Sequence, residues 1–284
     1  MKKANVVLIT VAVFMVIAGM AMVFVSFARN GFDYKKVVNM AKYDYKKFTF
    51  TEEINSIDLL IGSYSLKVVR SFDANTYFEC YVNDKNYFDA EVRNGMLKIE
   101  EKNDYRWWEL FTRGIGANYE DCVLSLPADE YEKLNADIGS GRFECNTGIQ
   151  FSKVDVSTGS GSILLDGVDA GDISVATGSG SISLNNMDAG RLYAKTGSGS
   201  IKLVNVITED KLTAKTGSGS IKLESVDGGE LELSTGSGSI SGSLKSAKKF
   251  VTSTGSGSVS VPENSDGGVC KADTGSGSIK LTVE

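Results

Sequence analysis

The hexapeptide TGSGSI, which first occurs at residues 158–163, returns with its threonine at Thr177, Thr196, Thr216, Thr235 and Thr274, and appears once as TGSGSV at Thr254. Successive threonines lie 19 or 20 residues apart. A fixed period of this size is typical of a solenoid, in which each repeat forms one coil and stacks on its neighbour. The repeated motif therefore decides the fold.

Apolar and polar residues alternate on both sides of each motif. Around Thr196, Leu192 and Ala194 precede the motif, and Ile201 and Leu203 follow it. Alternation indicates strands with one buried face, so each coil is predicted to hold two short strands. A helix is disfavoured because each interior glycine costs about 1 kcal/mol relative to alanine. The glycines are interpreted as positive-φ residues at a tight corner, where stacked coils align Thr and Ser hydroxyls into ladders.

The pattern reaches further toward the N-terminus than the perfect motifs. The stretches ADIGSGRFEC (136–145) and IDLLIGSYSLKV (57–68) fit the same template. Between them, residues 77–103 are predicted to form a β-hairpin with Asn94-Gly95 as its type I′ turn. The predicted fold is all-β, a parallel β-helix or solenoid with coils of 19–20 residues, preceded by one N-terminal transmembrane helix.

The chain is accordingly divided into four parts. They are a transmembrane anchor at 1–28, a juxtamembrane linker at 29–47, an N-terminal part of the solenoid with a hairpin and an aromatic insertion at 48–135, and the regular TGSGS repeats at 136–284.

The segment 6–27 carries no charge over 22 residues. About 20 apolar residues in a helix cross a bilayer, so a single membrane span is predicted. A cleavable signal peptide ending near Ala28 is the alternative, but its apolar region is typically about 7–15 residues. Basic residues on both sides of the span leave the orientation open: a literal count places the domain in the cytoplasm, whereas a short basic tail before a long apolar run favours export. We expect a single-pass protein of the cell membrane with an extracytoplasmic domain.

Composition excludes several function classes. The net charge of −6 and the lack of a dense Lys/Arg run argue against nucleic-acid binding. The chain has no histidine, which excludes His-based triads and imidazole metal ligands. The motif lacks the recurring Asp of calcium-binding β-rolls, and Asp169, Asp188 and Asp227 are interpreted as turn residues. The four cysteines show no CxxC spacing. We therefore expect no enzyme activity, cofactor or metal.

Two candidate interaction sites remain. The first is the aromatic insertion, with Tyr105, Trp107, Trp108 and Phe111, which is either a flap over the solenoid or a docking patch for a protein, wall polymer or membrane surface. The second is the final coil, where Ile279, Lys280 and Leu281 are predicted to form an unpaired strand edge. Such an edge either binds a partner strand, self-associates or frays in water.

One membrane segment, a VLSLP strand at 123–127, coils of about 20 residues and recurrent GSGSI turns resemble the DUF4097 β-strand repeat family, often labelled as candidate adhesins. The resemblance covers roughly residues 48–284. It implies a parallel β-helix in a bacterial, envelope-associated protein and supplies no catalytic residues. The aromatic insertion and the regular motif depart from the family pattern.

The leading functional interpretation is a non-enzymatic, membrane-anchored envelope protein that presents its solenoid as an adhesive, protein-binding or glycan-binding surface. The alternative is a regulatory, sensor or scaffold module of an envelope-stress system. An enzyme acting on wall polymers is the least favoured, because the outward positions hold lysine and serine without clustered carboxylates.

Overall fold

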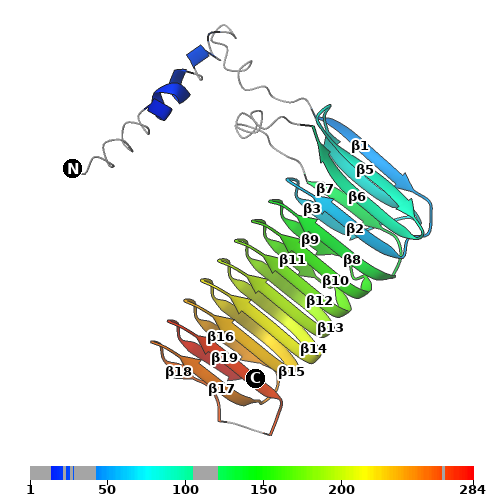
Figure 1. The fold of residues 1–284 in the computed structure, drawn as a ribbon. Coiled ribbons are helices and arrows are strands. Elements are labelled where there is room, and N and C mark those ends of the chain that lie inside the picture. Colours follow the sequence, from blue (N-terminus) through cyan, green and yellow to red (C-terminus); the bar gives the residue numbers. More distant parts are fainter. Residues whose placement is uncertain (1–13, 22–23, 26–27, 29–42, 105–120, 264–265) are drawn as a thin grey trace. The chain divides into compact units, whose positions relative to one another are not determined.

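The computed structural model describes residues 14–21, 24–25, 28, 43–104, 121–263 and 266–284. The chain divides into two compact units, of which the larger comprises Asp44–Asn103 with Tyr119–Glu284 and contains the strands β1–β20 (Figure 1). The smaller unit comprises Met1–Tyr43 with Asp104–Asn118, and a helix is described in it at residues 14–21. Among the described residues, no helix has the length and hydrophobicity of a membrane span. Most of the predicted anchor at 1–28 lies outside the described ranges.

The larger unit is a parallel β-solenoid, as predicted. One row of strands comprises β8 (Glu130–Ile138), β10 (Gln150–Thr158) and β12 (Asp169–Thr177), and a second row comprises β9 (Phe143–Asn146) and β11 (Ile163–Asp166). Three longer strands run from the second row into the first: β13 (Ile182–Thr196), β14 (Ile201–Thr216) and β15 (Ile221–Thr235). The motifs are in register, because each motif threonine lies beside the motif threonine of an adjacent coil, as Thr177 lies beside Thr196.

Alternation along the strands separates the core from the surface. Ile201 and Leu203 are fully buried, whereas Lys202 between them is exposed. The neighbouring coils repeat this column, since Ile182 and Ile221 lie on either side of Ile201. The core is therefore a set of apolar ladders that runs the length of the stack.

The two glycines of each TGSGS corner lie against the corner of the adjacent coil. A Cβ atom on Gly199 would lie 1.9 Å from the carbonyl oxygen of Gly180, and one on Gly197 would lie 2.4 Å from that of Gly178. The corner glycines do not have φ in the left-handed region, so the prediction that they supply positive φ is wrong. Glycine is required because successive backbones approach too closely for any side chain.

The motif threonine points inward and joins two coils. The Gly199 N–H donates to Thr196 Oγ1 at 3.1 Å, and the Thr196 hydroxyl donates to the Gly180 carbonyl oxygen at 2.8 Å. The threonines of all seven motifs make this pair of bonds. The predicted hydroxyl ladder is thus wrong for threonine, whose hydroxyl satisfies backbone groups.

Apart from the hairpin turn and Gly242, the positive φ angles lie at a second corner, which we call the asparagine corner. Its residues are Gly148, Gly167, Asn186, Asn205 and Ser225, with φ of 62°, 63°, 52°, 51° and 53°. Gly and Asn tolerate this left-handed conformation better than other residues. Asn205 Nδ2 donates to Asn186 Oδ1 at 3.1 Å, so the amides also form a ladder.

An antiparallel layer closes the N-terminal end of the solenoid. β5 (Asn86–Arg93) and β6 (Met96–Asn103) form a hairpin at the predicted turn, with φ of 51° at Asn94 and 73° at Gly95, as a type I′ turn requires. The hairpin is shorter than the predicted range 77–103, because the first residues of that range belong to another strand. The other strands of this end are β1 (Asp44–Phe50), β2 (Ser56–Ile61), β3 (Leu66–Arg70), β4 (Thr76–Val82) and β7 (Cys122–Leu126). β6 and β7 pair in parallel with β2 and β3, whereas β4 is antiparallel to β7 and β1. β1 begins inside the predicted linker at 29–47.

Glu101 on β6 ends the ladder of backbone hydrogen bonds that joins the TGSGS corners, which we call the tight corner, of successive coils. In the regular coils, corner N–H groups donate to the preceding corner, as Ser140 N–H does to the Gly62 carbonyl oxygen at 3.0 Å. The first corner donates instead to Glu101: the N–H groups of Gly62 and Ser63 lie 2.6 and 3.0 Å from its Oε2. A carboxylate thus takes the place of a missing coil.

The C-terminal end does not stack in chain order. Its strands are β16 (Ile240–Leu244), β17 (Lys249–Thr254), β18 (Val259–Ser260), β19 (Val269–Thr274) and β20 (Ile279–Val283). β19 pairs with both β15 and β17, and β20 pairs with both β16 and β18. The last coil of the sequence therefore lies between the coil that precedes it, with β17 and β18, and the layer of β15 and β16 (Figure 1).

The prediction that Ile279, Lys280 and Leu281 form the open edge is consequently wrong. Ile279 and Leu281 are buried, and the end layer is instead the coil of β17 and β18. That coil has the features of a protected edge: β18 contains two residues, and Pro262 follows it closely. Short strands and proline are common devices against edge-to-edge pairing.

Candidate functional site

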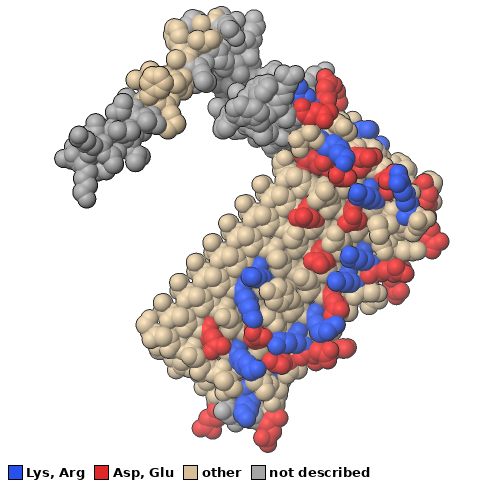
Figure 2. Space-filling view, viewed as in Figure 1, with Lys and Arg blue, Asp and Glu red and all other residues tan. Residues whose placement is uncertain are grey.

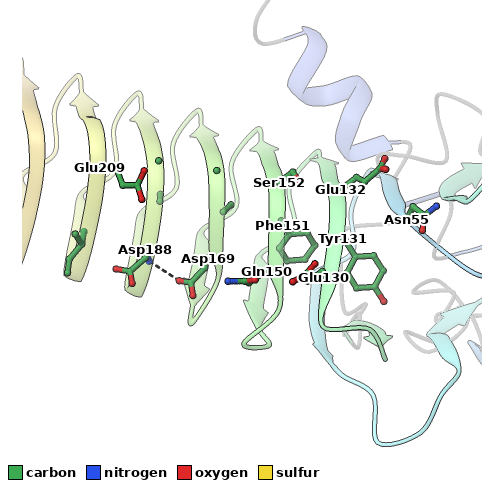
Figure 3. A pocket seen from close by; sticks show the side chains of 15 residues that line it. Asn55, Glu130, Tyr131, Glu132, Gln150, Phe151, Ser152, Asp169, Asp188 and Glu209 are labelled. Atoms are coloured by element: carbon green, nitrogen blue, oxygen red, sulfur yellow. Dashed lines mark hydrogen bonds between the residues drawn. The ribbon is translucent and has the colours of Figure 1, made fainter.

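A groove follows the third corner of the coils, which we call the groove corner. It has a volume of about 970 Å³ and crosses consecutive coils from β8 to β14 (Figure 3). Each coil contributes a short run to the lining: Glu130–Glu132, Gln150–Ser152, Asp169–Gly171, Asp188–Gly190, and Ile207 with Glu209, to which Asn55 is added at one end. The shape is that of an open trough, which suits an extended ligand better than a compact one.

Small residues hollow out the middle of the groove. Ala170-Gly171 and, one coil further on, Ala189-Gly190 occupy the positions that Phe151-Ser152 occupies in the coil before them. Gly190 has no room for a side chain, because its Cβ would lie 2.5 Å from the Gly171 carbonyl oxygen. The backbone itself therefore forms the floor here.

Two aromatic rings bound the groove at its N-terminal end. Tyr131 and Phe151 stack with ring centroids 5.8 Å apart and an interplanar angle of 24°. Both are 4% exposed, so they support the wall without offering a broad ring face to a ligand. The Ala128 N–H donates to Tyr131 Oη at 3.3 Å, and burial raises the pKa of this phenol, which stays protonated.

The rim of the groove is acidic. Glu130, Glu132, Asp169, Asp188 and Glu209 line it, and the lining contains no Lys or Arg. Within the described part of the chain, no ion pair engages these five carboxylates. One backbone bond reaches them, from the Asp188 N–H to Asp169 Oδ1 at 2.8 Å. The groove therefore carries a negative potential that favours cationic ligands.

The neighbouring outward face of the same coils is neutralised by ion pairs. Arg191 Nε lies 2.8 Å from Asp172 Oδ1, and Lys215 Nζ lies 2.6 Å from Glu232 Oε1. Lys211 joins Glu230 and Glu232, and Lys271 continues the ladder to Glu230. Figure 2 shows opposite charges interleaved on one face and an uncharged edge beside them. Carboxylates without basic partners thus distinguish the groove from this face.

The described residues offer neither a metal-binding cluster nor a reactive thiol. They contain no cluster of three or more Cys, Asp or Glu side chains that could hold a metal ion. Cys80, Cys122, Cys145 and Cys270 are free and buried. Burial raises the pKa of each thiol, to about 12 for Cys80, Cys145 and Cys270, so none is an activated nucleophile.

The sequence-derived candidates lie elsewhere. Tyr105, Trp107, Trp108 and Phe111 fall outside the described residues. Ile279 and Leu281 lie in the core, and only Lys280 of that trio is exposed. The groove was missed because Asp169 and Asp188 were interpreted as turn residues. The available signal was the column of small and acidic residues in the DAG runs at 169–171 and 188–190.

The stacked coils and the lateral groove place the protein among the parallel β-solenoid repeat proteins. Residues 54–266 match the Toastrack DUF4097 family, and the chain belongs to that family. No curated protein matches the chain.

The chain is similar to several solved structures. Three of them are a "putative adhesin" from Parabacteroides merdae (14% identity, TM-score 0.57, 84% of this chain and 96% of that chain covered), a "putative lipid binding protein" from Parabacteroides distasonis (20%, 0.55, 85% and 98%), and a "putative adhesin" from Bacteroides fragilis (14%, 0.51, 85% and 97%). At these identities the likeness shows the fold.

Proposed function

We propose that the protein is a non-enzymatic, membrane-anchored envelope protein whose solenoid is an adhesive interaction surface. The groove at the groove corner binds an extended, Lys- and Arg-rich segment of a partner protein. The single observation that carries this proposal is the groove rim, where five carboxylates face a trough without a basic partner. An extended basic segment supplies the missing charges along the stack.

A protein segment fits this groove better than a glycan or a lipid does. Glycan binding needs exposed aromatic faces, and the two rings of the groove are 4% exposed. An anionic lipid headgroup would be repelled by the acidic rim. The names of the similar structures, which refer to adhesins and a lipid-binding protein, agree with a binding role in general.

The proposed anchor is the uncharged segment 6–27, and the proposed location of the solenoid is the outer side of the cell membrane. Proteolysis of intact and of opened cells tests both parts. Cleavage of the solenoid in intact cells, with the segment 6–27 retained in the membrane fraction, is expected. Protection of the solenoid until the cells are opened would contradict the outward orientation.

The groove is tested with Glu130→Gln/Asp188→Asn, which removes two exposed rim carboxylates. The control is Glu224→Gln/Glu263→Gln, which removes two exposed carboxylates away from the groove. The probe is a fluorescent oligolysine peptide, followed by anisotropy on the full chain in detergent. We expect several-fold weaker binding for the groove variant than for the control, and binding that weakens with salt.

Equal loss in both variants would show that binding depends on net charge alone and would overturn the groove assignment. Binding of an uncharged glycan oligomer or of anionic vesicles, with none of oligolysine, would assign the surface to a different partner and would also overturn it.

A further inference from the structure

The last coil of the sequence lies between two coils that precede it in the sequence. This arrangement is at the C-terminal end of the solenoid, away from the groove. We define the terminal coil as residues 266–284, with β19 and β20, and the outer coil as residues 249–262, with β17 and β18. The terminal coil lies between β15–β16 on one side and the outer coil on the other. It therefore fills a slot whose two walls come from residues that precede it in the sequence.

The start of the outer coil is tied to the layer below the slot by contacts that do not involve the terminal coil. Lys248, which enters the outer coil, is 4% exposed, and its Nζ lies 2.6 Å from Asp227 Oδ1 and 2.8 Å from the Gly228 carbonyl oxygen. Ser246 Oγ donates to the same Asp227 oxygen at 2.8 Å. Asp227 and Gly228 belong to β15. These contacts therefore join the start of the outer coil to the layer of β15, past the layer that the terminal coil occupies. They fix where the outer coil begins, whereas its strands β17 and β18 pair with β19 and β20 of the terminal coil.

The walls of the slot recognise a TGSGS coil through the contacts that join any two coils. Thr274 Oγ1 donates to the Gly238 carbonyl oxygen at 2.8 Å on one wall. On the other wall, Thr254 Oγ1 donates to the Gly277 carbonyl oxygen at 2.8 Å. Neither contact depends on whether the inserted coil is covalently joined to the walls that receive it.

Two further contacts restrict the occupant to residues 266–284. Lys271 Nζ lies 3.4 Å from Glu230 Oε1 on β15. Glu284 Oε1 accepts hydrogen bonds from Ser225 Oγ at 2.5 Å and Ser243 Oγ at 2.8 Å. A coil from another part of the repeat, such as the one at Thr177, has Ser174 and Met187 at the positions that Lys271 and Glu284 occupy relative to Thr274, and it lacks these contacts. The slot thus fits the terminal coil of this chain or of a second copy.

We propose that the terminal coil is exchangeable, and that the slot of one copy accepts the terminal coil of a second copy to give a reciprocal dimer. The partner is a second copy of this chain, and the contacts in the dimer are those already described within one copy. Such an exchange conserves the contacts of the slot and changes only which copy supplies the terminal coil, so its free-energy difference is small and the fraction of dimer depends on protein concentration. Because the coil is buried on both sides, exchange takes place during folding, before the slot is filled.

The test uses thiol pairs in the full chain. Ser234→Cys/Asp273→Cys joins β15 to β19, because residues 234 and 273 are register partners. Parallel neighbours lie about 4.8 Å apart, within the Cα range of a disulfide. The control, Ser157→Cys/Ala176→Cys, joins β10 to β12, which exchange does not separate. If the first pair does not fold, Ser243→Cys/Thr282→Cys joins β16 to β20 instead.

Each variant is refolded in detergent at low and at high concentration, oxidised and separated without reductant. We expect the terminal-coil pair to give a covalent dimer whose fraction rises with concentration and which includes hybrids of two differently tagged copies. The control pair should stay monomeric. Monomer alone from the terminal-coil pair at every concentration would overturn the proposal. Failure of both terminal-coil pairs to form a disulfide would also overturn it, because the terminal coil would then not occupy the slot.

Discussion

The tight corner and the groove corner belong to the same coils, yet they differ in how strictly the sequence repeats. At the tight corner TGSGS is written seven times. At the groove corner, Gln-Phe-Ser at 150–152 gives way to Asp-Ala-Gly at 169–171 and 188–190, and then to Ile-Thr-Glu at 207–209. The strictly repeated corner is a packing solution, and the variable corner carries the candidate binding site.

The reason for this difference is space. A Cβ on Gly199 would overlap a backbone oxygen, and the Thr196 hydroxyl is held between two backbone groups, so few other residues fit. At the groove corner, the outward positions 130, 188 and 209 face solvent and accept any charge pattern. The sequence repeats where packing between coils permits few residue types. It varies where side chains face solvent, and there the residue types can suit a ligand.

The largest expected effect is at the tight corner. Gly199→Ala places a methyl group 1.9 Å from the Gly180 carbonyl oxygen, and adjacent coils must separate to relieve the overlap. We expect a loss of about 3 kcal/mol or more in the free energy of unfolding, measured with denaturant. The control is Ser198→Ala, one residue away and exposed, which should change little. Equal losses in the two variants would mean that intrinsic backbone propensity, and not the lack of space for a Cβ atom, determines the preference for glycine at position 199.

The second prediction concerns the threonine. Thr196→Val keeps the shape but removes the acceptor of the Gly199 N–H and the donor to Gly180. Unbonded buried polar groups cost about 1–3 kcal/mol, so we expect a loss of about 2 kcal/mol. Thr196→Ser retains both bonds and should lose less. A valine variant as stable as the wild type would show that the hydroxyl contacts are dispensable.

The sequence predicted the interior of the stack better than its ends. The apolar columns through Ile201 and Leu203 and the hairpin at Asn94-Gly95 follow from local alternation and turn chemistry, which act over a few residues. The order of the last coils could not be predicted, because Thr254 and Thr274 carry the same motif and fit the same neighbours. The end layers depend on residues that break the repeat, such as Glu101, Lys248 and Pro262. Glu101 and Lys248 bind partners that are distant in sequence.

The groove was harder to predict for a similar reason. The alternating pattern identifies which residues point outward, but it does not show that Gly171 and Gly190 line a groove together with the acidic residues of neighbouring coils. Nor does it show that the ion-pair ladder through Lys211 leaves the rim carboxylates unpaired. Both facts depend on the lateral register of several coils.

The third prediction compares the tight corner with the asparagine corner, where φ and not space is the limit. Asn205 has φ of 51° and donates to Asn186 Oδ1. Asn205→Ala should cost about 1 kcal/mol, because an alanine in the left-handed region is strained by about that amount. Asn205→Gly relieves the strain and should be closer to the wild type in thermal unfolding. The reverse order of the two variants would contradict the backbone explanation.

The smallest effect is expected on the ion-paired face, where neither space nor φ is limiting. Hydrogen bonds from Lys215 and then Lys211 lower the pKa of Glu232 to about 2. Because the folded-state pKa lies below the unfolded value of about 4.3, the stabilisation is complete above that value and is lost as pH falls toward 2. The group is partly solvated, so Glu232→Gln should cost at most about 1 kcal/mol at pH 7. The difference in melting temperature between wild type and variant should shrink on acidification and disappear near pH 2.

Glu224→Gln, which removes an exposed carboxylate without an ion pair, is the control and should differ little from wild type at neutral pH. A Glu232→Gln difference that stays constant with pH would show that the ladder through Lys211 and Lys215 contributes packing and not charge.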